Sequence, residues 1–239
     1  MRSNGPSSRR DFCRITAAAI LTRPLVGFAA QQAATGARPK VLTADESLRD
    51  LVAGNERFVQ GQTNNPRRSP SDFGALEKGQ YPQAVVITCS DSRVPPEILF
   101  DVGVGDLFVV RLAGNVVDGA GVTVKGSTEY AIAELKAPLI VVLGHSNCGA
   151  VKAAIQHIDA KDSLPGAING LVELLKPSVA KSKSMAGDAL ANAIIQNVKD
   201  GVAKLQQLEP IVAPAVKAGK VKVVGGVYDL KTGRVTLTT

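Results

Sequence analysis

The chain has 239 residues, of which 45% are hydrophobic, and a formal net charge of +7. This is enough apolar material for one substantial core, so we expect a single folded domain. The positive charge does not indicate nucleic-acid binding, because much of it lies in residues 1–30 and the chain has no Trp and only three Tyr with which to stack on bases.

Residues 1–30 resemble a twin-arginine export signal. Arg9-Arg10 and Phe12 precede an apolar stretch that is too short to span a bilayer, and small residues follow it. This interpretation predicts export to the periplasm and no stable membrane insertion after cleavage. The alternatives are a disordered, basic N-terminus and a retained, uncleaved anchor. Residues 31–43 then form a linker, and residues 44–239 form the folded domain.

An amphipathic helix is expected from Asp45 to Val59, where apolar residues recur at helical spacing. Thr43 and Asp45 are both suitable N-caps for this helix. The next segment, Gln60 to Ser71, is rich in Asn, Pro, Arg and Ser and therefore predicts an irregular connection.

Four runs rich in Val and Ile predict strands. The runs are continuously apolar rather than alternating, which is typical of strands covered on both faces in a parallel sheet. Helical patterns separate the runs, so the fold class is α/β, with a central, mostly parallel sheet flanked by helices. The predicted strands are 84–88, 107–111, 139–143 and 221–225, and the predicted helices are 123–135, one that begins over 149–157, and 188–208.

Two short motifs directly follow two of these strands, at 89–93 (Cys-Ser-Asp-Ser-Arg) and at 145–149 (His-Ser-Asn-Cys-Gly). Because ligands bind at the carboxyl ends of parallel strands, we expect Cys89, His145 and Cys148 to meet at one edge of the sheet. Two thiols and one imidazole are three ligands, and a catalytic zinc site uses three and leaves a fourth position open. The alternative is a Cys89–Cys148 disulfide, which would not need the histidine.

Both motifs, together with Gly54–Phe58 and Gly105–Asn115, resemble those of the β-class carbonic anhydrases. The resemblance covers nearly all of the chain after the linker. It implies one Zn²⁺ per chain, held by Cys89, His145 and Cys148, and reversible hydration of carbon dioxide to bicarbonate by zinc-bound hydroxide. It also implies a homodimer or homotetramer, in which the N-terminal helix is an arm over the partner and pocket residues are contributed across the interface.

The resemblance also assigns roles to single residues. Asp91 would accept the proton of the hydroxide in a hydrogen bond, and Arg93 would keep that carboxylate ionised and oriented. The substrate-binding positions that match the family are Gln80, which would hydrogen-bond the substrate, Phe108 and Tyr130, which would line a narrow apolar pocket, and Gly149, beside the zinc.

Other interpretations remain open. An enzyme with the same fold and metal site could act on carbon disulfide or carbonyl sulfide, because fold does not settle substrate. A non-catalytic zinc or redox module, in which Cys89 and Cys148 sense oxidation, belongs to a different class of protein. The Gly103-Val-Gly105 segment is expected to be a turn rather than a nucleotide loop. His157, the only other histidine, is expected to be solvated rather than a proton shuttle.

Overall fold

The structure is a computed structural model that describes residues 42–74, 76–118 and 121–238. These residues fall within one unit, Thr35–Thr239. The export signal predicted over residues 1–30 and nearly all of the predicted linker lie outside the described residues. Within the described ranges, no helix combines the length and apolar character needed to cross a membrane.

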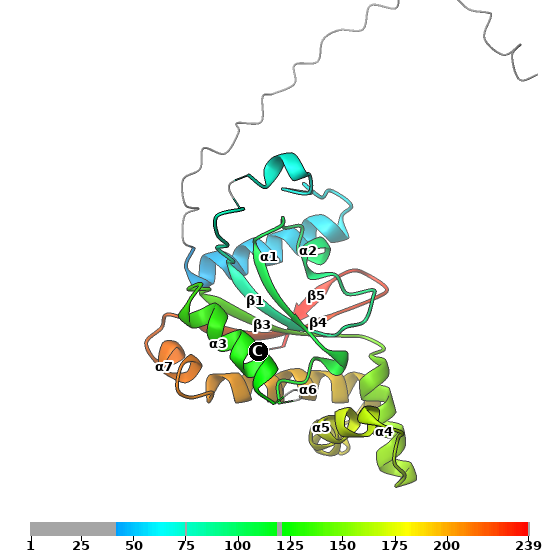
Figure 1. Cartoon of the computed structure of the whole chain (residues 1–239). Coiled ribbons are helices and arrows are strands. Elements are labelled where there is room, and N and C mark those ends of the chain that lie inside the picture. Colours follow the sequence, from blue (N-terminus) through cyan, green and yellow to red (C-terminus); the bar gives the residue numbers. More distant parts are fainter. Residues whose placement is uncertain (1–41, 75, 119–120, 239) are drawn as a thin grey trace, which may run out of the picture. The chain divides into compact units, whose positions relative to one another are not determined.

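A five-stranded sheet in the order β2-β1-β3-β4-β5 lies at the centre of the described chain (Figure 1). The first four strands are parallel, and β5 pairs antiparallel with β4. The predicted parallel α/β sheet is confirmed, whereas the fifth strand was not predicted. The strands are β1 Ala84–Thr88, β2 Leu107–Arg111, β3 Leu139–His145, β4 Lys222–Tyr228 and β5 Val235–Leu237.

Helices cover both faces of the sheet. They are α1 Ala44–Val59, α2 Pro96–Leu99, α3 Val122–Ala133, α4 Gly149–Ala160, α5 Ala167–Ser182, α6 Ala189–Gln206 and α7 Val212–Lys217, with short 3₁₀ turns at Pro70–Asp72 and Ala113–Asn115. Figure 1 shows α1 and α2 on one face and α3, α6 and α7 on the other. Helices α4 and α5 pack on each other and on α6.

The two faces of the central strands enter different cores. Val85 and Ile87 pack in the cluster that includes Val198 of α6, whereas Val86 packs in the cluster that includes Leu51 of α1. Every residue of β1 and β3 is buried. Because both faces are covered, these strands need apolar residues throughout, which explains their continuous Val and Ile runs. Strand β2, at the sheet edge, is only half-buried.

Helix α1 begins at the predicted cap. The Thr43 hydroxyl accepts the N–H of Glu46 at 3.2 Å, and the Thr43 N–H donates to the Glu46 carboxylate at 2.8 Å. This reciprocal capping box satisfies donors that would otherwise be left free at the helix start.

The Gly54-Asn55 pair fixes α1 to the rest of the domain. A Cβ at Gly54 would lie 1.8 Å from the carbonyl oxygen of Phe100, so the helix approaches α2 closely only because this residue has no side chain. The Asn55 amide donates to the carbonyl oxygen of Leu99 at 3.0 Å and accepts the N–H of Val235 at 2.8 Å. One buried side chain therefore ties α1 to both α2 and β5.

Candidate metal centre

The carboxyl ends of β1 and β3 bring a Cys-His-Cys group together. Cys89 follows β1, His145 is the last residue of β3, and Cys148 is the N-cap of α4. The two strands are adjacent and parallel, with Thr88 opposite Leu143, so their ends meet. The ligand atoms of the three residues lie within 4.8 Å of one another, and all three residues are buried.

One ring nitrogen of His145 is available to this group as a ligand. Its Nδ1 lies 2.9 Å from the carbonyl oxygen of Ser146, which can only accept, so Nδ1 carries the proton and donates. Nε2 is buried and has no hydrogen-bond partner in the part of the chain that the structure describes. A buried polar atom without a partner is costly, and coordination of a metal ion removes that cost. The group fits a metal ion, and zinc favours thiolate and imidazole ligands.

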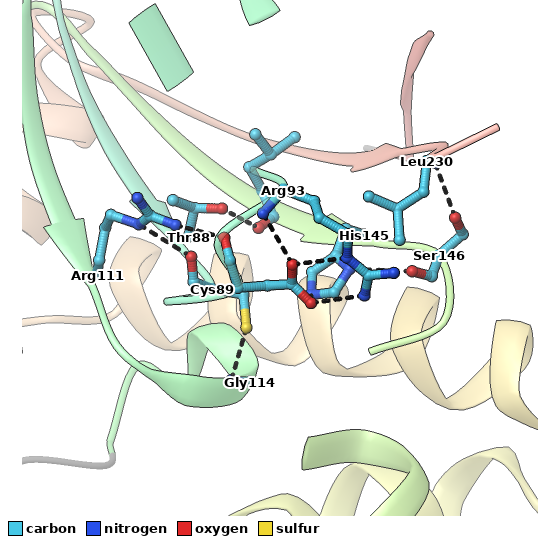
Figure 2. A network of polar contacts seen from close by, with 10 residues as sticks. Thr88, Cys89, Arg93, Arg111, Gly114, His145, Ser146 and Leu230 are labelled. Atoms are coloured by element: carbon cyan, nitrogen blue, oxygen red, sulfur yellow. Dashed lines mark hydrogen bonds and ion pairs between the residues drawn. The ribbon is translucent and has the colours of Figure 1, made fainter. Parts of the chain in front are cut away.

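The pKa values of the two thiols are shifted in opposite directions. The hydrogen bond from Cys148 lowers the pKa of Cys89 to about 4, and the N–H of Gly114, which donates to Cys89 Sγ at 3.2 Å, acts in the same direction (Figure 2). The same thiol–thiol hydrogen bond raises the pKa of Cys148. Burial lowers the pKa of His145, but its interaction with the Cys89 sulfur outweighs burial and the net shift is upward. Metal binding therefore has to release the Cys148 proton.

Asp91 lies beside the metal group and is held by Arg93. Nε and Nη2 of Arg93 donate to the two carboxylate oxygens at 2.9 and 2.7 Å, and the Arg93 backbone N–H donates at 3.0 Å. These hydrogen bonds keep the pKa of Asp91 well below its usual range, although burial opposes them. Oδ2 of Asp91 lies 3.8 Å from Nε2 of His145. The ionised carboxylate of Asp91 therefore lies next to the metal group, and both of its oxygens accept hydrogen bonds from the guanidinium of Arg93.

Further hydrogen bonds fix the backbone of the group. Arg111, the last residue of β2, donates from Nε to the carbonyl oxygen of Cys89 at 3.1 Å and from Nη2 to that of Asp91 at 2.6 Å (Figure 2). The Ser146 hydroxyl accepts the N–H of Leu230 at 2.9 Å, which ties the turn after β3 to the segment after β4. Sequence reasoning missed these roles. The available signals were the position of Arg111 at the end of a predicted strand and its place in the Gly105–Asn115 segment.

Three of the predicted substrate-binding residues lie away from the metal group of their own chain. Gln80 is exposed and precedes the amino end of β1, whereas Cys89 follows its carboxyl end, and a five-residue strand spans roughly 15 Å. Phe108, near the amino end of β2, contacts Tyr130 of α3, with ring centroids 6.2 Å apart. Only Gly149, the first residue of α4, adjoins the metal group.

The remaining motifs have ordinary structural explanations. Cys89 and Cys148 are both free, so the disulfide alternative is not the state of this structure. The N–H of Asp106 donates to the carbonyl oxygen of Gly103 at 3.2 Å, which confirms the predicted turn. His157 is partly exposed, and its Nδ1 lies 2.6 Å from a carboxylate oxygen of Asp162.

Comparisons with known proteins agree with this geometry. A family model described as carbonic anhydrase matches residues 84–235. The carbonic anhydrase of Mycolicibacterium smegmatis is 44% identical over 187 residues, which cover 78% of this chain and 89% of that protein. Carbonic anhydrase 2 of Mycobacterium tuberculosis is 42% identical over 188 residues, which cover 78% of this chain and 89% of that protein.

Solved structures give the same result. The Coccomyxa β-carbonic anhydrase in complex with acetazolamide matches with a TM-score of 0.62 and 32% identity, over 69% of this chain and 75% of that one. A tetrameric β-carbonic anhydrase from Sordaria macrospora matches with a TM-score of 0.63 and 25% identity, over 80% of this chain and 96% of that one.

Proposed function

The chain belongs to the β-class carbonic anhydrases, zinc enzymes that hydrate carbon dioxide reversibly, and we propose that Cys89, His145 and Cys148 hold its zinc ion. The observation that carries this assignment is the buried Nε2 of His145, which lacks a hydrogen-bond partner within the described ranges and faces two free thiols. The names of the relatives favour carbon dioxide over carbon disulfide or carbonyl sulfide as the substrate, and an enzyme over a redox module.

Zinc held by these side chains would act as a Lewis acid, which lowers the pKa of a water molecule to near neutrality. Asp91 accepts a hydrogen bond from the reacting water, which turns an oxygen lone pair toward carbon dioxide. Arg93 keeps the Asp91 carboxylate ionised and aimed, since a guanidinium binds both carboxylate oxygens in parallel. The space around Gly149 is open, since no surrounding atom lies within 4 Å of a Cβ added there.

A second copy of the chain completes the pocket in this proposal. Gln80 is exposed, and Tyr130 is 50% exposed against Phe108 at the β2 edge of the sheet. An exposed and a partly buried aromatic side chain at a half-buried sheet edge suit an interface between copies. Across that interface, the Gln80 amide hydrogen-bonds a substrate oxygen, and the two aromatic rings keep the partner's pocket narrow and apolar.

The assembly is a homodimer or a homotetramer in this proposal, with α1 as an arm over the partner. The tetrameric relative from Sordaria macrospora supports an assembly of this kind.

Export through a twin-arginine signal is a separate part of the proposal. Its support is the sequence of residues 1–30, with Arg9-Arg10 before a short apolar stretch. Mass spectrometry of the periplasmic fraction is expected to find a chain that has lost this segment, and an Arg9→Lys, Arg10→Lys double variant is expected to stay in the cytoplasm. Equal export of the double variant would contradict the assignment.

Stopped-flow measurement of carbon dioxide hydration on protein of known zinc content tests the function. The rate is expected to rise in proportion to zinc content and to fall with acetazolamide, the compound that the Coccomyxa enzyme binds. Zinc-loaded protein that leaves hydration at the uncatalysed rate, but releases sulfide from carbon disulfide or carbonyl sulfide, would overturn the substrate assignment.

A further inference from the structure

The hydrogen bond to the Cys89 sulfur comes from a residue that is itself held by a distant helix. The N–H of Gly114 donates to Cys89 Sγ at 3.2 Å, and the carbonyl oxygen of the same Gly114 accepts a hydrogen bond from Nδ2 of Asn197 at 2.9 Å. Asn197 lies on α6 and is 6% exposed. We propose that Asn197 is a positioning residue that fixes Gly114 so that its N–H points at the metal-binding thiolate of Cys89.

Gly114 needs such a restraint because of its backbone conformation. It has φ 76° and ψ 11°, in the left-handed region, and glycine populates both hands of the backbone almost equally. Its neighbours already leave little room, since an added Cβ would lie 3.1 Å from Leu175 and 3.2 Å from Ala150. The Asn197 amide adds a directional bond that selects the conformation in which the Gly114 N–H faces the sulfur.

Helix α6 is a rigid support for this bond. A Cβ at Gly144 would lie 2.7 Å from a methyl group of Val198, and one at Gly201 would lie 3.2 Å from a methyl group of Val142. The helix therefore packs directly on β3, and Gly144 is the residue before His145. Because Asn197 precedes Val198, the helix that holds Gly114 is fixed against the strand that carries the histidine ligand. Asn197 thereby fixes the Gly114 N–H, which donates to the Cys89 sulfur, relative to the imidazole of His145.

A hydrogen bond to a thiolate orients its lone pairs and withdraws electron density from the sulfur. Groups that orient metal ligands in this way typically change metal affinity or activity by about 10- to 100-fold. This inference depends on the proposed zinc site, since Asn197 acts only through Cys89.

The Asn197→Leu variant, which keeps the branched shape and the number of heavy atoms of the side chain but removes the donor, tests the proposal. In the cobalt-substituted protein, loss of the bond is expected to shift the sulfur-to-metal charge-transfer band to longer wavelength. Zinc release to a chelator is expected to become about 10-fold faster. Asn192→Leu is the matched control, because Asn192 lies on the same helix and donates to the carbonyl oxygens of Met185 and Ala186 at 3.3 and 3.1 Å. It is expected to change neither readout.

An Asn197→Leu variant with the wild-type absorption band would overturn the proposal, even if it released zinc faster, because only a structural role would then remain. A second measurement needs no variant. In cadmium-substituted wild-type protein, magnetic coupling through the hydrogen bond is expected between the Gly114 amide proton and cadmium, and its absence would also overturn the proposal. Failure of the wild type to bind zinc or hydrate carbon dioxide would instead overturn the proposed function, so the two failures are distinguishable.

Discussion

Oδ2 of Asp91 lies 3.8 Å from Nε2 of His145, while both oxygens of the same carboxylate accept hydrogen bonds from Arg93. The carboxylate is therefore close to the metal group but held by the guanidinium of Arg93. The metal group then offers three side chains that could hold a metal ion, the number of protein ligands typical of catalytic zinc sites. In the proposed function, this relationship separates the residues that would hold the metal from Asp91, which would orient the reacting water.

We expect Asp91→Asn to lower the rate of carbon dioxide hydration by about 100-fold or more, because the amide cannot replace the ionised acceptor. Zinc content is expected to stay unchanged, since all three ligands remain. Stopped-flow rates and metal analysis measure both quantities. Asp159→Asn is the control, because its exposed carboxylate pairs with Lys183 at 2.8 Å and touches no part of the metal group. Equal rates for Asp91→Asn and wild type would contradict the role of Asp91.

Mixed assemblies test whether Gln80 serves the partner's pocket. When Gln80→Ala and Asp91→Asn chains are unfolded together and refolded, each mixed dimer contains one site with both residues intact if Gln80 acts across the interface. Random pairing then recovers about one quarter of wild-type activity, since half of the dimers are mixed and each has one intact site of two. No activity above the sum of the separate variants would show that Gln80 acts within its own chain or not at all.

Asp101 is expected to make the stability of the domain pH-dependent. Its side chain is fully buried, and it accepts hydrogen bonds from Arg57 Nε at 2.7 Å and from the backbone N–H groups of Asn64 and Asn65 at 2.9 Å. Burial raises the pKa of Asp101, but these hydrogen bonds outweigh it, and the net pKa lies below the usual 3.8. The stabilisation is therefore complete above pH 3.8 and is lost as pH falls through the lower, folded-state pKa.

We expect Asp101→Asn to lower the free energy of unfolding by about 2 kcal/mol at neutral pH, at fixed protein concentration. The difference from wild type is expected to shrink as the pH falls below 3.8. Urea denaturation at neutral and acidic pH measures it, with the exposed Glu77→Gln as a control that matches wild type at both. A difference that is the same at both pH values would contradict this account of Asp101.

Gly54→Ala is expected to destabilise the domain by about 2 kcal/mol or more, because the new Cβ would lie 1.8 Å from a backbone oxygen and the helix has to move. Gly170→Ala in α5 is the matched control. No atom lies within 4 Å of a Cβ there, so it is expected to stabilise the helix by about 0.5–1 kcal/mol. Thermal denaturation distinguishes the two, and equal stability of the two variants would contradict the close approach of α1 to α2.

The sequence predicted those strands and helices that are marked by a pattern within their own residues. Strands β1 and β2 have the predicted bounds, because each is a short run of β-branched residues with clear ends. Strand β5 has three residues and forms only by pairing with β4, so no run of its own reveals it. Helix α5 was missed because Gly170 and Pro177 interrupt its helical pattern, which its packing on α4 and α6 overrides.

In the candidate site, too, some contacts could be predicted from the sequence and others could not. Cys89, His145 and Cys148 could be placed together from sequence, because parallel strands deliver their carboxyl ends to one edge. The bonds of Arg111 to the backbone after β1 and of Asn197 to Gly114 could not be predicted, because they join segments 20 or more residues apart whose proximity exists only in the folded chain. Neither residue type nor spacing carries that information.

X-ray absorption at the zinc edge of the purified protein tests the metal group most directly. We expect one zinc ion per chain with two sulfur ligands at about 2.3 Å, one imidazole nitrogen at about 2.0 Å and one further light atom. His145→Ala is expected to change this spectrum, and His157→Ala is expected to leave it unchanged. Protein that binds no zinc, or that binds it through nitrogen and oxygen alone, would contradict the assignment of Cys89, His145 and Cys148.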